Sequence, residues 1–444
     1  MSTIPQVSQA MQTVLTTAAE AADRQLHYTK RPDRAKLSAS TLVQTLVLGW
    51  LAHPDATVDQ LAQTAACVGV EVSPQAIDQR FTLATANLLQ TVLTSAVQQA
   101  ISGDAVALPL LQRFTGVRVH DGTTIALPDG LAERWAGCGG RSHVGTSAAL
   151  KCGVQLDLLT GALTALDLAS GRTHDSSLPC QHAAQPPGSL RLADLGFYDL
   201  QRLAELDRSQ VYFLSKLRPN TRVRAPDLAG LDLATFVTQH AATGYDGWVQ
   251  IGKEHPLRAR LLVQSVPQEV ADQRRRRIRK EAREKGQTAS AAALLLAAWT
   301  ILITNAPLRL LTLVEALVLA RVRWQIELIF KLWKSHGQID TWRTARAERI
   351  LCEVYAKLLA MVLQQWMLIV GCWEYADRSL TKAAQVIRDH AIELASARAR
   401  GERLCDVLET IQRVLRRTAR MNPRAKDPHT YQLLLALTTV DEQA

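Results

Sequence analysis

The spacing of apolar residues changes twice along the chain and divides it into regions of different predicted structure. From residue 1 to about 112, apolar residues recur every three or four positions among Ala, Leu and Gln, which predicts helices. From about 113, short apolar runs bounded by turn residues predict strands. After about residue 310 the helical spacing returns and continues to the last residues. The pattern therefore predicts a mixed α+β protein.

The middle region predicts a specific order of strands. Residues 117–121 form a short apolar run, and residues 149–158 and 162–168 flank a Leu-Thr-Gly turn, which predicts a hairpin. Residues 190–194 form another short strand, followed by the helical word YDLQRLAEL and a strand at 211–217. Three antiparallel strands followed by strand, helix and strand is the order of a ribonuclease-H-like core.

A less regular region interrupts this core. It contains Pro and Gly turns, short strands near 247–251 and 258–263, and a helix at 271–285 with six Arg and two Lys against three acids. A strand at 299–304 and a long helix at 310–335 then resume the core. The predicted regions are a helical N-terminal part (1–112), the first part of the core (113–217), a β-rich insertion (218–298), the second part of the core (299–345) and a helical C-terminal part (346–444).

Within the N-terminal part, residues 59–81 predict a helix-turn-helix. Ser73 is a favourable N-cap, and Pro74 follows it at the first helical position. An ordinary helical hairpin is the alternative interpretation. If the second helix binds DNA, the side chains that it presents to bases or phosphates are Gln75, Gln79 and Arg80.

Composition narrows the class of partner. The chain has 444 residues, 47% of them hydrophobic, which suffices for two or three domains with cores of their own. The formal net charge of +10 favours a polyanionic partner such as nucleic acid. The seven cysteines are scattered without a CxxC pair, which is typical of reduced thiols rather than a zinc site. No signal peptide is apparent and the longest apolar runs fall short of a bilayer span, so we expect a cytoplasmic protein without membrane contact.

Two acids share a context that suggests metal chemistry. Asp121 and Asp194 each end a short apolar strand, and a Gly follows closely in the words DGT and DLGF. If the strands are adjacent, the two carboxylates lie close together and persist mainly where a cation neutralises them. Oxygen ligands of this kind select Mg²⁺ or Mn²⁺ over zinc. Two unrelated turn aspartates are the alternative, and Asp175 in GRTHDSS competes for the role of second ligand.

A third acid comes from the predicted helix that contains RVRWQIELIFKLWKS. Ile326, Phe330 and Trp333 mark its buried side. The charged residues on a second face of this helix could simply be exposed and form ion pairs along it, each of which stabilises a helix by about a few tenths of a kcal/mol. We instead expect Glu327 to join the two aspartates. The residues on that face, spaced i, i+4, i+8 and i+11, are Arg323, Glu327, Lys331 and Lys334.

These residues resemble the DDE transposases of bacterial insertion sequences, of the insertion-sequence-4 type. That family is marked by the signature Tyr-(2)-Arg-(3)-Glu-(6)-Lys on the helix with the third acid. Arg323, Glu327 and Lys334 have this spacing, while Ala320 occupies the Tyr position. Other segments are similar to the family as well, so the resemblance covers roughly residues 115–345. These segments are DGTTIALPDGLAERWAGCGG, HVGTSAALKCGVQLDLLTG, LADLGFYDL and WTILITNAP.

The resemblance implies a catalytic site with two Mg²⁺ or Mn²⁺ ions. Asp121 would bridge both ions, and Asp194 and Glu327 would each hold one. Arg323 and Lys334, with Lys331 beside them, would bind phosphate near the cleaved bond.

The resemblance also implies the reaction and its partners. It implies cleavage at the ends of an insertion sequence and strand transfer into target DNA, by a homodimer that holds two terminal inverted repeats in a bacterial, nucleoid-associated complex. Trp299 resembles a family Trp that fills the gap left by a flipped base, although a buried strand aromatic is an equal alternative. Ala320 lacks the phosphate contact expected of the family's Tyr. The alternatives are a ribonuclease-H-like nuclease without strand transfer and a catalytically decayed DNA-binding derivative.

Overall fold

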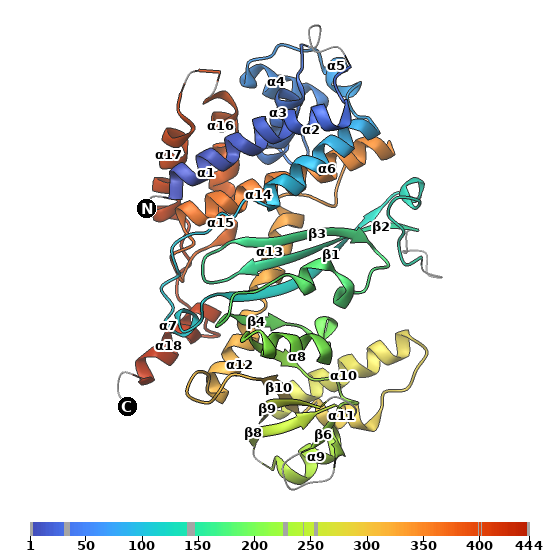
Figure 1. Cartoon of the computed structure of the whole chain (residues 1–444), viewed down its shortest axis with the longest axis vertical. Coiled ribbons are helices and arrows are strands. Elements are labelled where there is room, and N and C mark those ends of the chain that lie inside the picture. Colours follow the sequence, from blue (N-terminus) through green and yellow to red (C-terminus); the bar gives the residue numbers. More distant parts are fainter. Residues whose placement is uncertain are drawn as a thin grey trace.

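The computed structural model describes residues 3–30, 36–139, 147–224, 230–242, 244–252, 256–397, 399–400 and 402–441. Residues 143–146, which belong to one of the family-like words, lie outside the described residues. Helices gather at one end of the molecule, a sheet crosses the middle, and a smaller α/β part forms the other end (Figure 1). The strands are β1 Val117–Leu127, β2 Ala148–Asp157, β3 Leu163–Ser170, β4 Leu190–Ala193, β5 Tyr212–Lys216, β6 Arg222–Arg224, β7 Leu231–Asp232, β8 Gly244–Ile251, β9 Leu257–Ser265 and β10 Trp299–Thr304.

The helices frame this sheet at both ends of the molecule. The N-terminal ones are α1 Thr3–Gln12, the π-helical turn η1 Thr13–Ala18, α2 Ala19–Leu26, α3 Ala39–Ala52, α4 Val58–Val68, α5 Pro74–Asp78, α6 Leu83–Val97 and α7 Pro109–Gln112. The others are α8 Leu200–Arg208, α9 Leu233–His240, α10 Gln268–Glu284, α11 Ala291–Leu296, α12 Leu313–Val322, α13 Gln325–Ser335, α14 Ala347–Gly371, α15 Leu380–Asp389, α16 Ala391–Ala397, α17 Leu404–Thr418 and α18 Thr430–Asp441. Short 3₁₀ turns are η3 Asp129–Leu131, η4 Asp175–Ser177, η5 Pro179–His182 and η6 Leu195–Phe197.

The sheet has the strand order β3-β2-β1-β4-β5-β10-β9-β8-β6-β7. Strands β1, β2 and β3 pair antiparallel, and β4 pairs parallel with both β1 and β5. A large mixed sheet with this first half is compatible with a ribonuclease-H-like domain. The predicted hairpin and the strand–helix–strand unit around α8 are confirmed.

The expected end of the first strand at Asp121 is wrong, because β1 continues to Leu127. Gly122 resembled a turn residue in the sequence, but it pairs across the ladder with Gly153 of β2. The β-branched residues that follow it keep the extended conformation, with Thr123 opposite Cys152. Asp121 therefore lies within a strand, beside the point where the neighbouring strand β4 ends.

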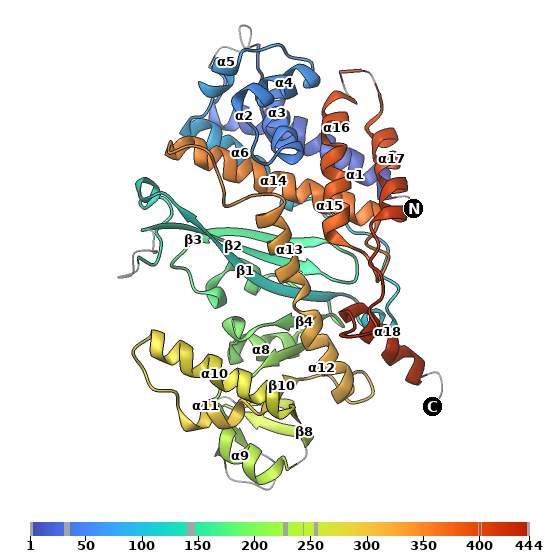
Figure 2. The ribbon, with the colours of Figure 1, turned by 180° about the vertical axis from the view of Figure 1, so that it is seen from behind.

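The strands of residues 218–298 extend the same sheet through β10, which pairs antiparallel with β5 on one side and β9 on the other. Residues of this part share an apolar cluster with α8, β5 and β10, which includes Phe236, Phe213 and Ile303. The basic helix α10 lies beside the start of β10, where Arg274 donates to the carbonyl of Trp299 at 2.9 Å. Figure 2 shows α10 on the side of the molecule toward which the tips of β1 and β2 project.

Helices from both ends of the sequence share one core around α14. Residues of α3, α6, α14 and α17 belong to a single apolar cluster that reaches the sheet. The α14 helix is anchored to the β2–β3 turn, where Gln365 donates to the carbonyl of Gly161 at 2.8 Å. It is long and apolar enough to cross a membrane by length and composition, but that stretch is entirely buried inside the protein. A core helix of a folded domain accounts for it.

The single long helix expected over 310–335 is wrong, because it is interrupted between α12 and α13 at Arg323 and Trp324. The N–H of Trp324 donates to the carbonyl of Arg321, and that of Ile326 to Arg323, which are 3₁₀-type hydrogen bonds. Neither Pro nor Gly occurs here, so the sequence held no signal for the break. A tight turn in the middle of a helix is often a functional feature.

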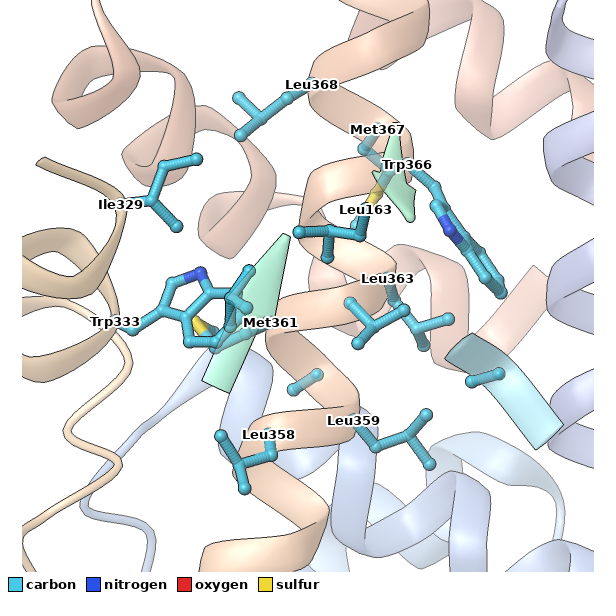
Figure 3. Packing of buried hydrophobic residues seen from close by; sticks show 14 of the residues in the cluster. Leu163, Ile329, Trp333, Leu358, Leu359, Met361, Leu363, Trp366, Met367 and Leu368 are labelled. Carbon is cyan, nitrogen blue, oxygen red and sulfur yellow. The ribbon is translucent and has the colours of Figure 1, made fainter. Parts of the chain in front are cut away.

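The α13 helix is held in place by its apolar side. Ile326 and Trp333 are almost fully buried, as the spacing predicted. In Figure 3 Trp333 lies against Met361 of α14, and Ile329 points toward the same helix. This packing fixes the opposite side of α13, which bears Glu327, over the sheet.

Candidate active site

The parallel pairing of β1 and β4 brings the two predicted aspartates together. His120 lies opposite Ala193 in the ladder, so the next residues, Asp121 and Asp194, are neighbours. β4 ends at Ala193, and the chain then turns into η6. The two carboxylates therefore lie at the carboxyl end of β4.

Arg323 connects these aspartates with the third predicted acid. Its Nη1 lies 3.7 Å from Oδ2 of Asp121, and its Nη2 lies 3.9 Å from Oδ2 of Asp194 and 2.6 Å from Oε1 of Glu327. Only 13% of the arginine side chain is exposed, so one shielded guanidinium contacts all three acids. The interruption between α12 and α13 places Arg323 there, at the end of α12 that faces the sheet.

The surroundings of the two aspartates shift their pKa values in opposite directions. The pKa of Asp121 is raised to about 6, mainly by burial and also by Glu327 and Asp194, although the Gly122 N–H and Arg323 lower it. Burial also raises the pKa of Asp194, but Lys216, the Leu195 N–H and Arg323 outweigh it and hold that pKa below its usual value. Asp194 thus stays ionised where Asp121 takes up a proton.

The donor set fits a divalent cation. Three carboxylates supply hard oxygen ligands, and the two cations that contact them, Arg323 and Lys216, leave an excess of negative charge when all three are ionised. The Nη1 atom of Arg323 is buried and has no hydrogen-bond partner among the described residues, so the guanidinium satisfies the acids only partly. Among the described residues, no group of three His, Cys, Asp or Glu side chains is arranged to hold a metal ion. In this structure Arg323 contacts each of the three acids instead.

Lysines border the acids on two sides. Lys216, which the sequence reading missed, contacts Oδ1 of Asp194 at 2.9 Å. Its signal was the charged end of the strand VYFLSKL, since β5 runs parallel to β4 and pairs Ser215 with Ala193. Lys334 donates to the carbonyl of Thr124 at 3.1 Å, so it lies over β1.

Three further predicted residues, Lys331, Ala320 and Trp299, lie on α13, α12 and β10 respectively. Lys331 lines a cavity between α13 and α18, together with Trp324 and Arg424. Ala320 packs against the main apolar cluster with part of its surface accessible. Trp299 begins β10 and packs partly buried against the apolar cluster of residues 198–303.

The predicted helix-turn-helix residues lie in the N-terminal helical part, apart from the acids. The first helix, α4, ends at Gly69, and the second, α5, has five residues after the Ser73 cap. Gln75 and Gln79 are exposed, and Arg80 is partly buried.

Asp175, the alternative second ligand, also lies beside the site. Its Oδ1 contacts Nζ of Lys151 at 2.8 Å. Among the ion pairs of the described residues, Arg323 contacts Asp121, Asp194 and Glu327 but not Asp175. The structure therefore brings Asp194, rather than Asp175, to the common arginine.

Comparison with known proteins places these acids inside one matched region. A family described as the transposase DDE domain matches residues 112–363, which include Asp121, Asp194 and Glu327. The chain is similar to the transposase for insertion sequence element IS231F of Bacillus thuringiensis subsp. israelensis, with 25% identity over 93% of this chain and 91% of that protein. It is also similar to the transposase for insertion sequence element IS1151 of Clostridium perfringens, with 26% identity over 66% of each protein.

We expect the affinity for Mn²⁺ to depend on pH through Asp121. A protonated carboxyl group does not bind the ion, and the pKa of Asp121 is about 6 without metal. The apparent affinity should therefore fall by about tenfold per pH unit below that value and change little through this group above it. Calorimetric titration between pH 5 and 7.5 measures this. Equal affinity over the whole range would contradict a ligand role for Asp121.

Proposed function

The chain belongs to the transposase DDE domain family, and from this premise we propose that Asp121, Asp194 and Glu327 are its catalytic acids. It is a DDE transposase of a bacterial insertion sequence, an enzyme of DNA transposition that uses divalent metal ions. The observation that carries the assignment is the contact of a single guanidinium, that of Arg323, with all three carboxylates.

The three acids would hold two Mg²⁺ or Mn²⁺ ions, with Asp121 as the shared ligand. Ions so bound supply an activated hydroxyl nucleophile and stabilise the leaving 3′-oxygen in phosphoryl transfer. The protein's part is to gather the ligands on rigid elements: β1, the end of β4 and α13. Because the pKa of Asp194 is held low, that ligand is ionised over the whole physiological range.

Cations beside the acids would orient the DNA strand. Arg323 has a planar fork that can bind a phosphate bidentately when it is released from the carboxylates. Lys334, over β1, and Lys331, at the edge of the neighbouring cavity, would add point charges along the backbone. Water would cut the strand at the element's end, and the freed 3′-hydroxyl would then attack target DNA.

The wider assembly follows from this reaction. Two ends must be cut and joined together, so we propose a homodimer that holds two terminal inverted repeats beside target DNA in the bacterial cytoplasm, on the nucleoid. The α4–α5 segment with Gln75, Gln79 and Arg80 would bind end DNA, and Trp299 would stack on a base. Residues 218–298 would be an insertion in the catalytic core, between 113–217 and 299–345, flanked by the helical parts 1–112 and 346–444.

One observation favours a second candidate. Ala320 stands where the family signature has Tyr, so a derivative that binds DNA but does not transpose it is the alternative. Strand transfer of precut ends would exclude both this derivative and a nuclease that only hydrolyses DNA. An end-cleavage assay separates those two, because only the nuclease cuts.

Replacing any one acid by its amide, in Asp121→Asn, Asp194→Asn or Glu327→Gln, should reduce end cleavage by more than about a hundredfold. Loss of an outer partner of a metal ligand already costs about 10–100-fold, so loss of a ligand should cost more. Cleavage of a labelled end fragment in Mg²⁺ measures it, with DNA affinity unchanged in a gel-shift assay. The matched control is Asp406→Asn, an exposed carboxylate on α17 paired with Arg403. Normal cleavage by Glu327→Gln would remove Glu327 from the site.

The basic helix α10 offers a second contact with DNA. Arg277 and Lys280 pair with Glu281 and Glu284 on the same helix. Three other arginines of α10 are exposed and have no ion pair among the described residues: Arg276, Arg279 and Arg283. Their spacing of i, i+3 and i+7 places them on one face of the helix. Unpaired cations in a row are suited to the phosphates of a DNA backbone.

Changing Arg276, Arg279 and Arg283 together to Ala should weaken DNA binding mostly at low salt. The slope of log affinity against log salt is negative, and each lost phosphate contact reduces its magnitude by about 0.9, so the triple variant should reduce that magnitude by up to about 2.7. Fluorescence anisotropy over a salt series measures the slope. Arg277→Ala with Lys280→Ala is the control, since both residues are paired within the helix. A triple variant with the wild-type slope would exclude α10 from the interface.

A further inference from the structure

Three glycines near the acids pack against residues 175–180, in the segment that follows β3. Gly122 and Gly153 lie directly opposite each other on β1 and β2, and Gly196 lies in η6, two residues after Asp194. A Cβ atom on Gly153 would approach the Leu178 side chain at 2.7 Å, so Leu178 would have to shift to admit a larger residue there. Leu178 and Cys180 are buried there in a small cluster with Ala193 and Phe197. The segment is therefore packed against the residues on both sides of Asp194.

The Asp175 carboxylate lies close to two of these glycines, Gly122 and Gly196. Its Oδ1 lies 3.5 Å from the position of a Cβ on Gly122, and its Oδ2 lies 2.9 Å from that of a Cβ on Gly196. Gly122 follows Asp121 in the chain, and Gly196 follows Asp194 closely. One carboxylate thus lies beside the glycine that closely follows each of the two aspartates, and a Cβ atom at residue 196 would require that carboxylate to shift.

Lys151 holds that carboxylate in place. Its Nζ lies 2.8 Å from Oδ1 of Asp175 and also donates to the carbonyl of Thr173 at 2.6 Å. Lys151 is only 14% exposed and extends from β2, where it pairs with Thr124 of β1. Its charge offsets a fourth negative group beside three others, which would otherwise repel them.

Two other roles for this pair fit less well. Exposed ion pairs add little to stability, and Asp175 is 36% exposed, so holding the fold together is a weak reason for it. As a direct metal ligand Asp175 is the weaker candidate, because the ion pairs of the described residues join Arg323 to Asp121, Asp194 and Glu327 but not to Asp175. The position of the pair, between the two aspartate-bearing segments, is its distinguishing feature.

We propose that Asp175, fixed by Lys151, is a positioning residue that sets the spacing between Asp121 and Asp194. The proposal rests on the proposed function, because it concerns the same metal ligands. The Asp175 carboxylate acts as a spacer between the backbones of Gly122 and Gly196, so that the two aspartates are held ready to share ions rather than being drawn together when ions bind.

The test is Mn²⁺ binding, followed by electron paramagnetic resonance of the free ion, with thermal melting of the metal-free protein in parallel. Asp175→Ala and Lys151→Met should each weaken binding by about 10–100-fold, the effect expected for outer partners of metal ligands. Asp175→Asn, which keeps the shape of the spacer, should recover part of the affinity. Melting temperatures should stay close to that of the wild type. Asp406→Ala, which removes an exposed paired carboxylate on α17, is the control and should bind like the wild type.

A double-mutant cycle makes the test specific for the contact. Gly196→Ala should weaken Mn²⁺ binding in the wild-type background, because the new Cβ displaces Asp175, and should add little to Asp175→Ala, where the carboxylate is gone. Additive effects, or unchanged affinity in Asp175→Ala, would overturn the proposal. Complete loss of binding in Asp175→Ala, as expected for Asp121→Ala, would also overturn it by making Asp175 a ligand. Wild-type protein that binds no Mn²⁺ would instead overturn the proposed function, and this inference with it.

Discussion

Three carboxylates that share one small volume repel each other, and the site depends on offsetting that repulsion. Two unit charges about 4 Å apart interact by about 4 kcal/mol at the effective dielectric constant near a protein surface. Without metal, Arg323 supplies the compensating charge, since its guanidinium contacts Asp121, Asp194 and Glu327. The compensation is incomplete, because burial and the other two acids still raise the pKa of Asp121 to about 6. Under the proposed function, a divalent cation bound by these acids would complete the compensation.

The fold gathers these acids with elements that come from distant parts of the sequence. The parallel pairing of β1 with β4 makes the two aspartates neighbours, and the apolar packing of α13 on α14 presses the third acid toward the sheet. The interruption between α12 and α13 then turns Arg323 inward. Helices of both termini share one core around α14, so the same packing that stabilises the helical end also fixes the site.

The sequence predicted those features whose cause is local. The hairpin around Gly161 and the unit around α8 have turn residues and apolar spacing of their own, and the acids could be recognised by their position after short strands. What the sequence missed depends on contacts between segments. Gly122 resembles a turn residue in the sequence, but its pairing with Gly153 keeps it within β1, and neither Pro nor Gly marks the break at Arg323. Lys216 and Lys151 contact Asp194 and Asp175 only because strand pairing brings these distant segments together.

The claim that these three acids bind ions is tested most directly by replacing Mg²⁺ with Fe²⁺ and generating hydroxyl radicals at the bound ion. The radicals cut the backbone close to the ion, and mass spectrometry locates the cuts. The account predicts cuts clustered around residues 121, 194 and 327, and their loss in Asp121→Ala. Cuts concentrated elsewhere in the chain, or a pattern that Asp121→Ala leaves unchanged, would contradict it.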